Sequence, residues 1–153
     1  MRLFHNILSL DKETSEKIRW VILVEGVPFQ LYIHKDRVPK PVAEHIEVSI
    51  FSDKSLFTKL LLKVGKKTVG DLSKEEKSDL NLIGLDDSFL EHAGSNAIIG
   101  GTFRPEAHKH TETIRYNAGR YGKELQFGDP YVPISLLPDP YPERLLFLVG
   151  WRH

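Results

Sequence analysis

The amino-acid sequence predicts a mainly β, α+β fold: an antiparallel, partly open barrel or a sandwich of six to seven strands, with two short helices. Three observations lead to this expectation. Short segments with a period of two recur along the chain, and only residues 53–84 change to a helical period. Strands and helices do not alternate, as a parallel sheet would require. We therefore expect residues 1–153 to form a single β-rich domain, within which residues 53–84 are a helical excursion.

The first predicted strand is residues 2–10, in which apolar and polar side chains alternate weakly, and residues 11–17 form a polar turn. The next strand is residues 18–25, which is apolar at successive positions from Trp20 to Val24. A short run that is apolar on both faces is typical of a strand covered on both sides. We expect this strand to be innermost in the sheet.

A β-hairpin follows, with its turn at Gly26. Residues 27–34 form the returning strand, and its apolar face consists of Phe29, Leu31 and Ile33. Residues 35–42 contain two prolines and should form a connector and not a strand, because proline cannot donate a hydrogen bond to a strand ladder.

Residues 45–51 alternate cleanly and predict a half-exposed strand. Three apolar residues should point inward and three polar ones outward; these are Ile46, Val48 and Ile50, and His45, Glu47 and Ser49 respectively.

The two helices are predicted from apolar spacing and end signals. After Ser52 the apolar residues recur at helical spacing, at Leu56, Phe57, Leu60, Leu61 and Val64, and Gly65 follows where a helix would end. The second helix should begin at Ser73, where Glu76 completes a capping box, and reach about Ile83 before Gly84.

The C-terminal half is predicted to hold two strands, a coil and a final strand. Residues 96–103 form a strand with a bulge or a close approach at Gly100 and Gly101. The remaining segments are a strand over 108–116, a proline-rich coil over 119–142 and a central strand over 145–151.

Composition limits the class of protein. The chain has no cysteine, so it has no disulfide and no thiolate metal site. Its apolar runs fall far short of the ~20 residues of a membrane span, and its N-terminus does not resemble a signal peptide, so we expect a cytoplasmic protein and no membrane partner. It has one methionine and six Asn and Gln residues, a depletion that favours a thermophilic source.

The net charge is zero, but the charges are segregated along the chain. Residues 54–67 carry five lysines and no acid, residues 71–91 carry seven acids and two lysines, and residues 92–123 carry five bases and two acids. Such blocks are often solvated faces. Two basic blocks on one face would instead form a local patch on a neutral protein.

The second basic block also contains tyrosines and glycines, a combination that favours nucleic-acid binding. Arginine and lysine pair with phosphates, and tyrosine rings stack on bases. The leading hypothesis is a non-catalytic nucleic-acid-binding module without a cofactor, which would use Arg104, Arg115, Tyr116, Arg120, Tyr121 and Lys123. Three lysines of the first block, Lys63, Lys66 and Lys67, would extend the track if they share its face. The same run also fits a surface loop whose tyrosines pack on the core.

A second hypothesis is a metal-binding enzyme. His108, His110 and Glu112 would share one face of a strand, and two imidazoles ~6.6 Å apart can converge on one divalent metal. After Gly101 and Pro105 this spacing resembles the first metal-binding motif of the cupins, which implies a β-barrel metalloenzyme. In cupins the glutamate lies further along, at a position this chain fills with Ile114 or Arg115, and only His153 remains as a downstream histidine. Solvent-facing histidines on an edge strand are the alternative.

A third hypothesis is a structural protein that binds a partner chain. Its proline-rich segment, residues 128–142, would pack on that chain, with Tyr131 and Tyr141 as anchors of the kind that interfaces favour. The sequence leaves the oligomeric state open.

Overall fold

The computed structural model describes residues 1–55, 58–106, 112–117 and 127–153. The described residues form nine strands: β1 (Arg2–Glu13), β2 (Lys17–Val24), β3 (Val27–His34), β4 (His45–Phe51), β5 (Ile98–Thr102), β6 (Arg104–Pro105), β7 (Thr113–Asn117), β8 (Tyr131–Pro133) and β9 (Leu145–Arg152). They also form three α-helices: α1 (Thr58–Val64), α2 (Lys74–Leu82) and α3 (Asp87–Ala93). The mainly β class is confirmed, with more strands and one more helix than predicted.

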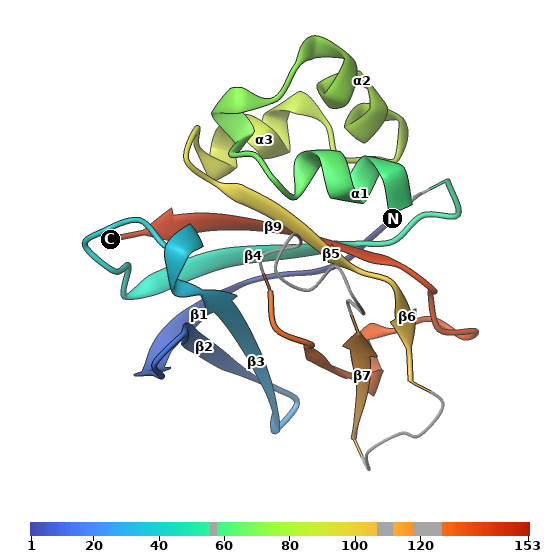
Figure 1. Ribbon diagram of the computed structural model, residues 1–153. Coiled ribbons are helices and arrows are strands. Elements are labelled where there is room, and N and C mark those ends of the chain that lie inside the picture. The colour runs from blue at the N-terminus through green and yellow to red at the C-terminus, as the bar shows by residue number, and fades with distance from the viewer. Residues whose placement is uncertain (56–57, 107–111, 118–126) are drawn as a thin grey trace.

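The strands form one antiparallel sheet in the order β5-β9-β4-β1-β2-β3-β8-β7-β6. The first and last strands of this order, β5 and β6, are consecutive in the chain and only Phe103 separates them. The two edges of the sheet are therefore joined covalently, and the sheet curls into a nearly closed barrel (Figure 1). Of the two predicted architectures, the barrel is the one that the chain adopts.

The interior of the barrel is filled by one face of each long strand. The predicted apolar face of β3 is fully buried, which confirms the hairpin; its residues are Phe29, Leu31 and Ile33. The inward residues predicted for β4 are also fully buried; these are Ile46, Val48 and Ile50. Two tryptophans are central: the Trp20 and Trp151 rings lie 5.9 Å apart between centroids. The Trp20 indole N–H donates to the carbonyl oxygen of Ala43 at 3.0 Å.

Figure 1 shows the helices stacked on the sheet beside β5 and β9. Side chains of the helices and of the outer face of β4, β5 and β9 form a second core between them. Alternate residues of β9 point to opposite sides, so that Phe147 enters the barrel while Leu146 and Leu148 meet the helices. The prediction that residues 145–151 are buried on both faces is confirmed. Because both cores share these strands, the chain forms a single domain.

The predicted close approach at the paired glycines occurs at Gly101. A Cβ atom there would lie 2.6 Å from Cδ2 of Leu61, on α1, and 3.0 Å from the carbonyl oxygen of Leu145. The β5–β9 register runs without a shift, so the glycines mark packing of a helix on the strand and not a bulge.

The prediction that β2 is covered on both faces is wrong. Trp20 is fully buried, but Leu23 is 66% exposed, and the outer residues around it are only partly buried. The helical layer covers the β5–β9–β4 side of the sheet and leaves the outer face of β2 without a covering layer among the described residues. The predicted polar turn also starts too early, because β1 continues to Glu13 and pairs there with Ile18.

The sequence analysis predicted α2 correctly but did not predict α3. The Ser73 hydroxyl accepts from the backbone N–H of Glu76 at 3.1 Å, and the Glu76 carboxylate accepts from the backbone N–H of Ser73 at 2.8 Å. Helix α3 has equivalent signals, an N-cap at Asp86 and a terminating glycine, Gly94, with φ of 99°. The helical excursion therefore extends to residue 93 and not 84. None of the described helices has the length and apolar character needed to cross a membrane.

Candidate functional site

The lysines predicted to bind phosphate line an open hollow between α1 and the start of α2, which we call the lysine hollow. Its volume is about 570 Å³, and its lining residues are Lys59, Leu62, Lys63, Lys66, Lys67, Ser73, Glu75 and Glu76. Lys59, Lys63 and Lys66 are exposed, and none of them forms an ion pair among the described residues. Lys59 and Lys63 are four residues apart on α1 and therefore share one side of the helix, and Lys66 follows just after the helix ends.

Lys67 differs from the other lysines because its charge is compensated. Its Nζ atom lies 2.8 Å from Oε1 of Glu76, the residue that also completes the capping box of α2. Burial alone would raise the pKa of Glu76, but the hydrogen bonds from Lys67 and from the Ser73 backbone outweigh it and lower that pKa. Glu76 therefore stays ionised, and Lys67 connects α2 to the end of α1.

The predicted arginines lie on a different part of the barrel. Arg104 is exposed on β6. Arg115, on β7, is paired with two carboxylates: its NH2 atom is 2.9 Å from Oδ2 of Asp129 and its NH1 atom is 3.4 Å from Oε1 of Glu106. The Arg115 guanidinium also lies 5.9 Å from the ring centroid of Tyr131. Its positive charge is thus largely balanced by neighbouring side chains.

The predicted stacking role of Tyr116 is not compatible with its position. The Tyr116 side chain is fully buried in the barrel core, and its hydroxyl donates to the carbonyl oxygen of Pro142 at 2.7 Å. Burial raises the pKa of this hydroxyl above its usual value. Alternation along β7 places Ile114 and Tyr116 inward and Arg115 outward, so the ring cannot meet a nucleic-acid base.

The other predicted residues of the loop, Arg120, Tyr121 and Lys123, lie outside the described residues, and so do the proposed metal ligands His108 and His110. The third proposed ligand is described: Glu112 is exposed just before β7, and its backbone carbonyl accepts from the N–H of Ile134 at 3.0 Å. Within the described ranges, no three His, Asp or Glu side chains are placed to hold a metal ion.

Among the described residues, the lysines of the hollow and the arginines of β6 and β7 lie on different parts of the protein. Figure 1 shows the helical layer on one side of β5 and β9, while β6 and β7 extend away from it at the other end of the barrel. The lysine hollow is therefore a site of its own, and any nucleic acid on it would not reach Arg104 and Arg115 along one flat face.

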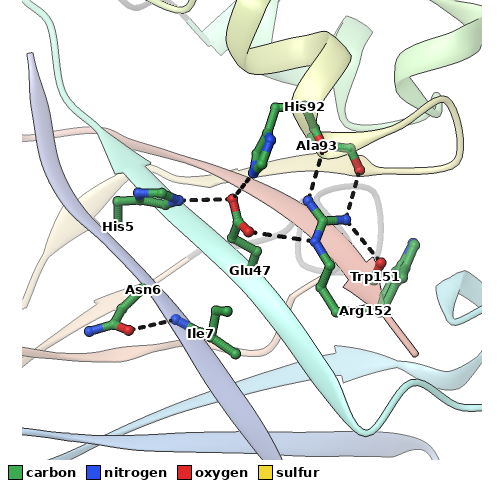
Figure 2. Close-up of polar contacts among 8 residues, drawn as sticks. All are labelled: His5, Asn6, Ile7, Glu47, His92, Ala93, Trp151 and Arg152. Carbon is green, nitrogen blue, oxygen red and sulfur yellow. Dashed lines mark hydrogen bonds and ion pairs between the residues drawn. The ribbon is translucent and has the colours of Figure 1, made fainter.

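A second polar site was not predicted. It consists of His5, Glu47, His92 and Arg152, which we call the Glu47 cluster, and these residues come from β1, β4, α3 and β9 (Figure 2). Oε2 of Glu47 lies 2.9 Å from Nε2 of His5 and 2.6 Å from Nε2 of His92, while Oε1 lies 3.5 Å from Nε of Arg152.

Arg152 also holds the end of α3. Its NH2 atom donates to the carbonyl oxygen of His92 at 2.9 Å, and its NH1 atom donates to the carbonyl oxygens of Trp151 at 3.0 Å and Ala93 at 3.5 Å. Carbonyls at a helix C-terminus lack partners within the helix, and a cation there is favourable. The Glu47 cluster thus fixes α3 on the sheet.

Glu47 carries the negative charge of this cluster. Its side chain is only 14% exposed, and burial alone would raise its pKa. Hydrogen bonds from His5 and His92, with the positive charge of Arg152, outweigh burial and lower the pKa. An ionised carboxylate only accepts hydrogen bonds, so both imidazoles must carry a proton on Nε2.

Of the four residues in the Glu47 cluster, the sequence indicated the position of Glu47 alone. The alternation of β4 correctly placed Glu47 on the outer face of the barrel, but the prediction that this face is exposed is wrong at Ser49, which is only 6% exposed. Its partners are separated from it by 42 residues in the case of His5 and 45 residues in the case of His92. Neither periodicity nor spacing signals contacts between residues so far apart, because the sheet order and the docking of α3 create them.

Comparison with known proteins does not assign the chain to a family. No family model matches it, and no curated protein is detectably similar to it in sequence. Function must therefore be inferred from the sites themselves.

Proposed function

We propose that this protein binds nucleic acid through the lysine hollow, without catalysing a reaction. The observation that carries the proposal is the gathering of four lysines in one open hollow on a protein whose net charge is zero. The charged residues of the lining are four lysines and two glutamates, which leaves a local charge of +2. A concentration of one sign of charge attracts a polyanion even when the whole protein is neutral.

The free lysines would bind phosphates and not bases. Lys59, Lys63 and Lys66 project from one short helix and its exit, and no aromatic ring is among the described residues that line the hollow. Ammonium groups on flexible side chains contact phosphates without reading a sequence. Binding should therefore be independent of sequence and strongly dependent on salt, because each phosphate contact releases counterions.

The acidic residues limit how close the nucleic acid can come. Glu76 is neutralised by Lys67, but Glu75 is exposed at the start of α2. A phosphate backbone would therefore follow the α1 side of the hollow, beside Lys59, Lys63 and Lys66. The sequence also predicts contacts from Arg120, Tyr121 and Lys123, which lie outside the described residues.

Fluorescence anisotropy with labelled single- and double-stranded oligonucleotides, at two or more salt concentrations, tests the proposal. The double variant K63A/K66A should weaken binding of all sequences alike. On duplex DNA it should lower the slope of log K against log salt by about 2, since each phosphate contact contributes roughly 0.9.

The matched control is K12A/K40A. It removes the same charge from two exposed lysines outside the hollow, so it should leave the salt slope unchanged. Equal losses in the two double variants would show that only total charge matters and would refute a defined site. Failure of the folded wild-type protein to bind any oligonucleotide at low salt would refute nucleic-acid binding altogether.

A further inference from the structure

One side of α2 presents an apolar side chain to solvent. Leu82, the last residue of this helix, is 82% exposed, the largest exposed fraction among the large hydrophobic side chains that the structure describes. Glu75 and Asp79 precede it at helical spacing, so the three residues lie on the same side of α2. We call these three residues the α2 stripe. Within the described part of the chain, neither carboxylate forms an ion pair.

The α2 stripe borders the lysine hollow. Glu75 belongs to the lining of the hollow, and so do Lys59 and Lys63 of α1. The opposite flank of α2 is turned away from the hollow, since Lys77 lines a separate depression together with residues of α3. Helices α1 and α2 are neighbours in the layer that covers the sheet (Figure 1). The protein therefore carries a basic and an acidic strip side by side on one face.

The two strips match in spacing and are opposite in sign. Lys59 and Lys63 are four residues apart on α1, and Glu75 and Asp79 are four residues apart on α2. Four residues correspond to ~6 Å along a helix axis. Two lysines of one molecule can therefore meet two carboxylates of another molecule at the same time. Within one molecule, none of these four side chains is paired with another described residue.

The apolar residues of this face are also complementary. Leu82 projects from the α2 stripe, and the lining of the hollow includes a partly buried leucine, Leu62. Contact between Leu82 of one copy and Leu62 of another would remove exposed apolar surface from water. The described part of the chain leaves Leu82 uncovered, so a second molecule is needed to bury it.

A two-fold axis would pair the two strips twice. In a symmetric dimer each surface patch meets the same patch of the other copy, so the α1 lysines of each copy face the α2 stripe of the other. Two copies do not repel each other, because the net charge is zero. The face spans two helices of roughly 10–14 Å, and it is therefore far smaller than the ~800 Å² per partner of a standard interface. Such a dimer is weak and depends strongly on salt.

We propose that two copies of this chain form a weak, salt-sensitive symmetric dimer through α1 and α2. Lys59 and Lys63 of each copy pair with Glu75 and Asp79 of the other, and Leu82 is buried at the contact. The dimer covers the lysines of the hollow, so dimerisation and binding of a nucleic acid there exclude each other. The dimer itself does not rest on nucleic-acid binding, and a test without nucleic acid keeps the two proposals separate.

Sedimentation equilibrium of the full chain, without nucleic acid, tests the proposal. With protein at up to ~1 mM, the apparent mass should rise toward that of two copies at ~20 mM salt and remain that of one copy at ~500 mM salt, where the Debye length is only about 4 Å.

Exchanging the charges of the two strips gives a sharper test. K59E/K63E and E75K/D79K each place like charges opposite each other, so each should raise the dissociation constant of the dimer more than about tenfold. The quadruple variant K59E/K63E/E75K/D79K exchanges the two strips and restores their complementarity, so the dimer should return. Its net charge equals that of the wild type, and recovery therefore cannot arise from net charge. Circular dichroism checks that each variant is folded.

The apolar contact has a matched pair of variants. L82N should raise the dissociation constant more than about tenfold, because a two-fold dimer loses the contact twice. L23N is the control: Leu23 is 66% exposed on the outer face of β2, away from the helices, and its replacement should leave the dimer unchanged.

Four results would overturn the proposal. For the folded wild-type protein, they are a mass of one copy at the highest concentration and low salt, and a mass that rises beyond two copies. A quadruple variant that is folded but stays monomeric would exclude pairing of the two strips. Equal losses in L23N and L82N would exclude the α2 stripe as the contact.

Discussion

Replacing Gly101 with alanine tests how α1 is held on the barrel, and therefore how the lysine hollow is positioned. The new Cβ atom would lie 2.6 Å from Cδ2 and 3.1 Å from Cδ1 of Leu61, and 3.0 Å from the carbonyl oxygen of Leu145. The Leu61 methyl groups can move, but the Leu145 carbonyl belongs to the strand paired with β5 and cannot. The new methyl group therefore strains the strand pair and displaces the Leu61 side chain, which loosens the packing of α1 on the sheet.

The expected cost of this change is about 1–3 kcal/mol, the range for overpacking a well-packed core. The loss of unfolded-state entropy that normally favours alanine over glycine contributes only about 0.4–1 kcal/mol in the opposite direction. For 153 residues the unfolding entropy is roughly 0.3 kcal/mol/K, so a net loss of about 2 kcal/mol lowers the melting temperature by about 6 °C.

Urea unfolding followed by tryptophan fluorescence measures this cost, because Trp20 and Trp151 are both buried in the barrel. The double variant L61A/G101A should be less destabilised than the sum of the two single variants, since truncation of Leu61 removes the clash. The control is G128A: the nearest atom to a Cβ there is Nζ of Lys17 at 3.2 Å, at the end of a flexible side chain, so its stability should change by less than about 0.5 kcal/mol.

A G101A protein as stable as wild type would refute the close packing of α1 on β5. Additive effects in the double variant would show that Leu61 is not the residue that the new methyl group meets.

Two further predictions concern the stability of the protein at low pH and its melting temperature. The pKa of Glu76 is lowered in the fold, so its stabilisation is fully present above the unfolded value of about 4.5 and is lost as the pH falls through the folded value. E76Q should therefore be about 1–2 kcal/mol less stable than wild type at pH 7 by urea unfolding, and the difference should shrink below about pH 4; a difference independent of pH would contradict this. The scarcity of Met, Asn and Gln predicts a melting temperature above the ~45–65 °C of mesophile domains by circular dichroism, and a value inside that range would refute the thermophilic source.

The elements that depend on local interactions could be predicted from the sequence. Alternation along β3 and β4 follows from the pleat of a strand, and it identified the buried residues Phe29, Leu31 and Ile46 directly. The capping box of Ser73 and Glu76 joins groups three residues apart, so its pattern is visible in the chain. Gly100 and Gly101 predicted a bulge or a close approach, because a glycine in a strand provides no side chain to pack, and the structure has the close approach, at Gly101.

How these elements meet could not be predicted from the sequence, because it depends on long-range packing. The sequences of β2 and β9 are both short apolar runs, and such a run has the same pattern whether or not helices cover its outer face. The sequence therefore could not distinguish β9, which is buried on both faces, from β2, which is exposed on one. Packing also decides which predicted residues are available to a ligand. It neutralises Lys67 with Glu76 and buries Tyr116 completely, so neither residue can bind as predicted. The Glu47 cluster joins residues from four distant segments, and the order of strands in the barrel brings them together, because contacts across a sheet follow its topology and not sequence distance.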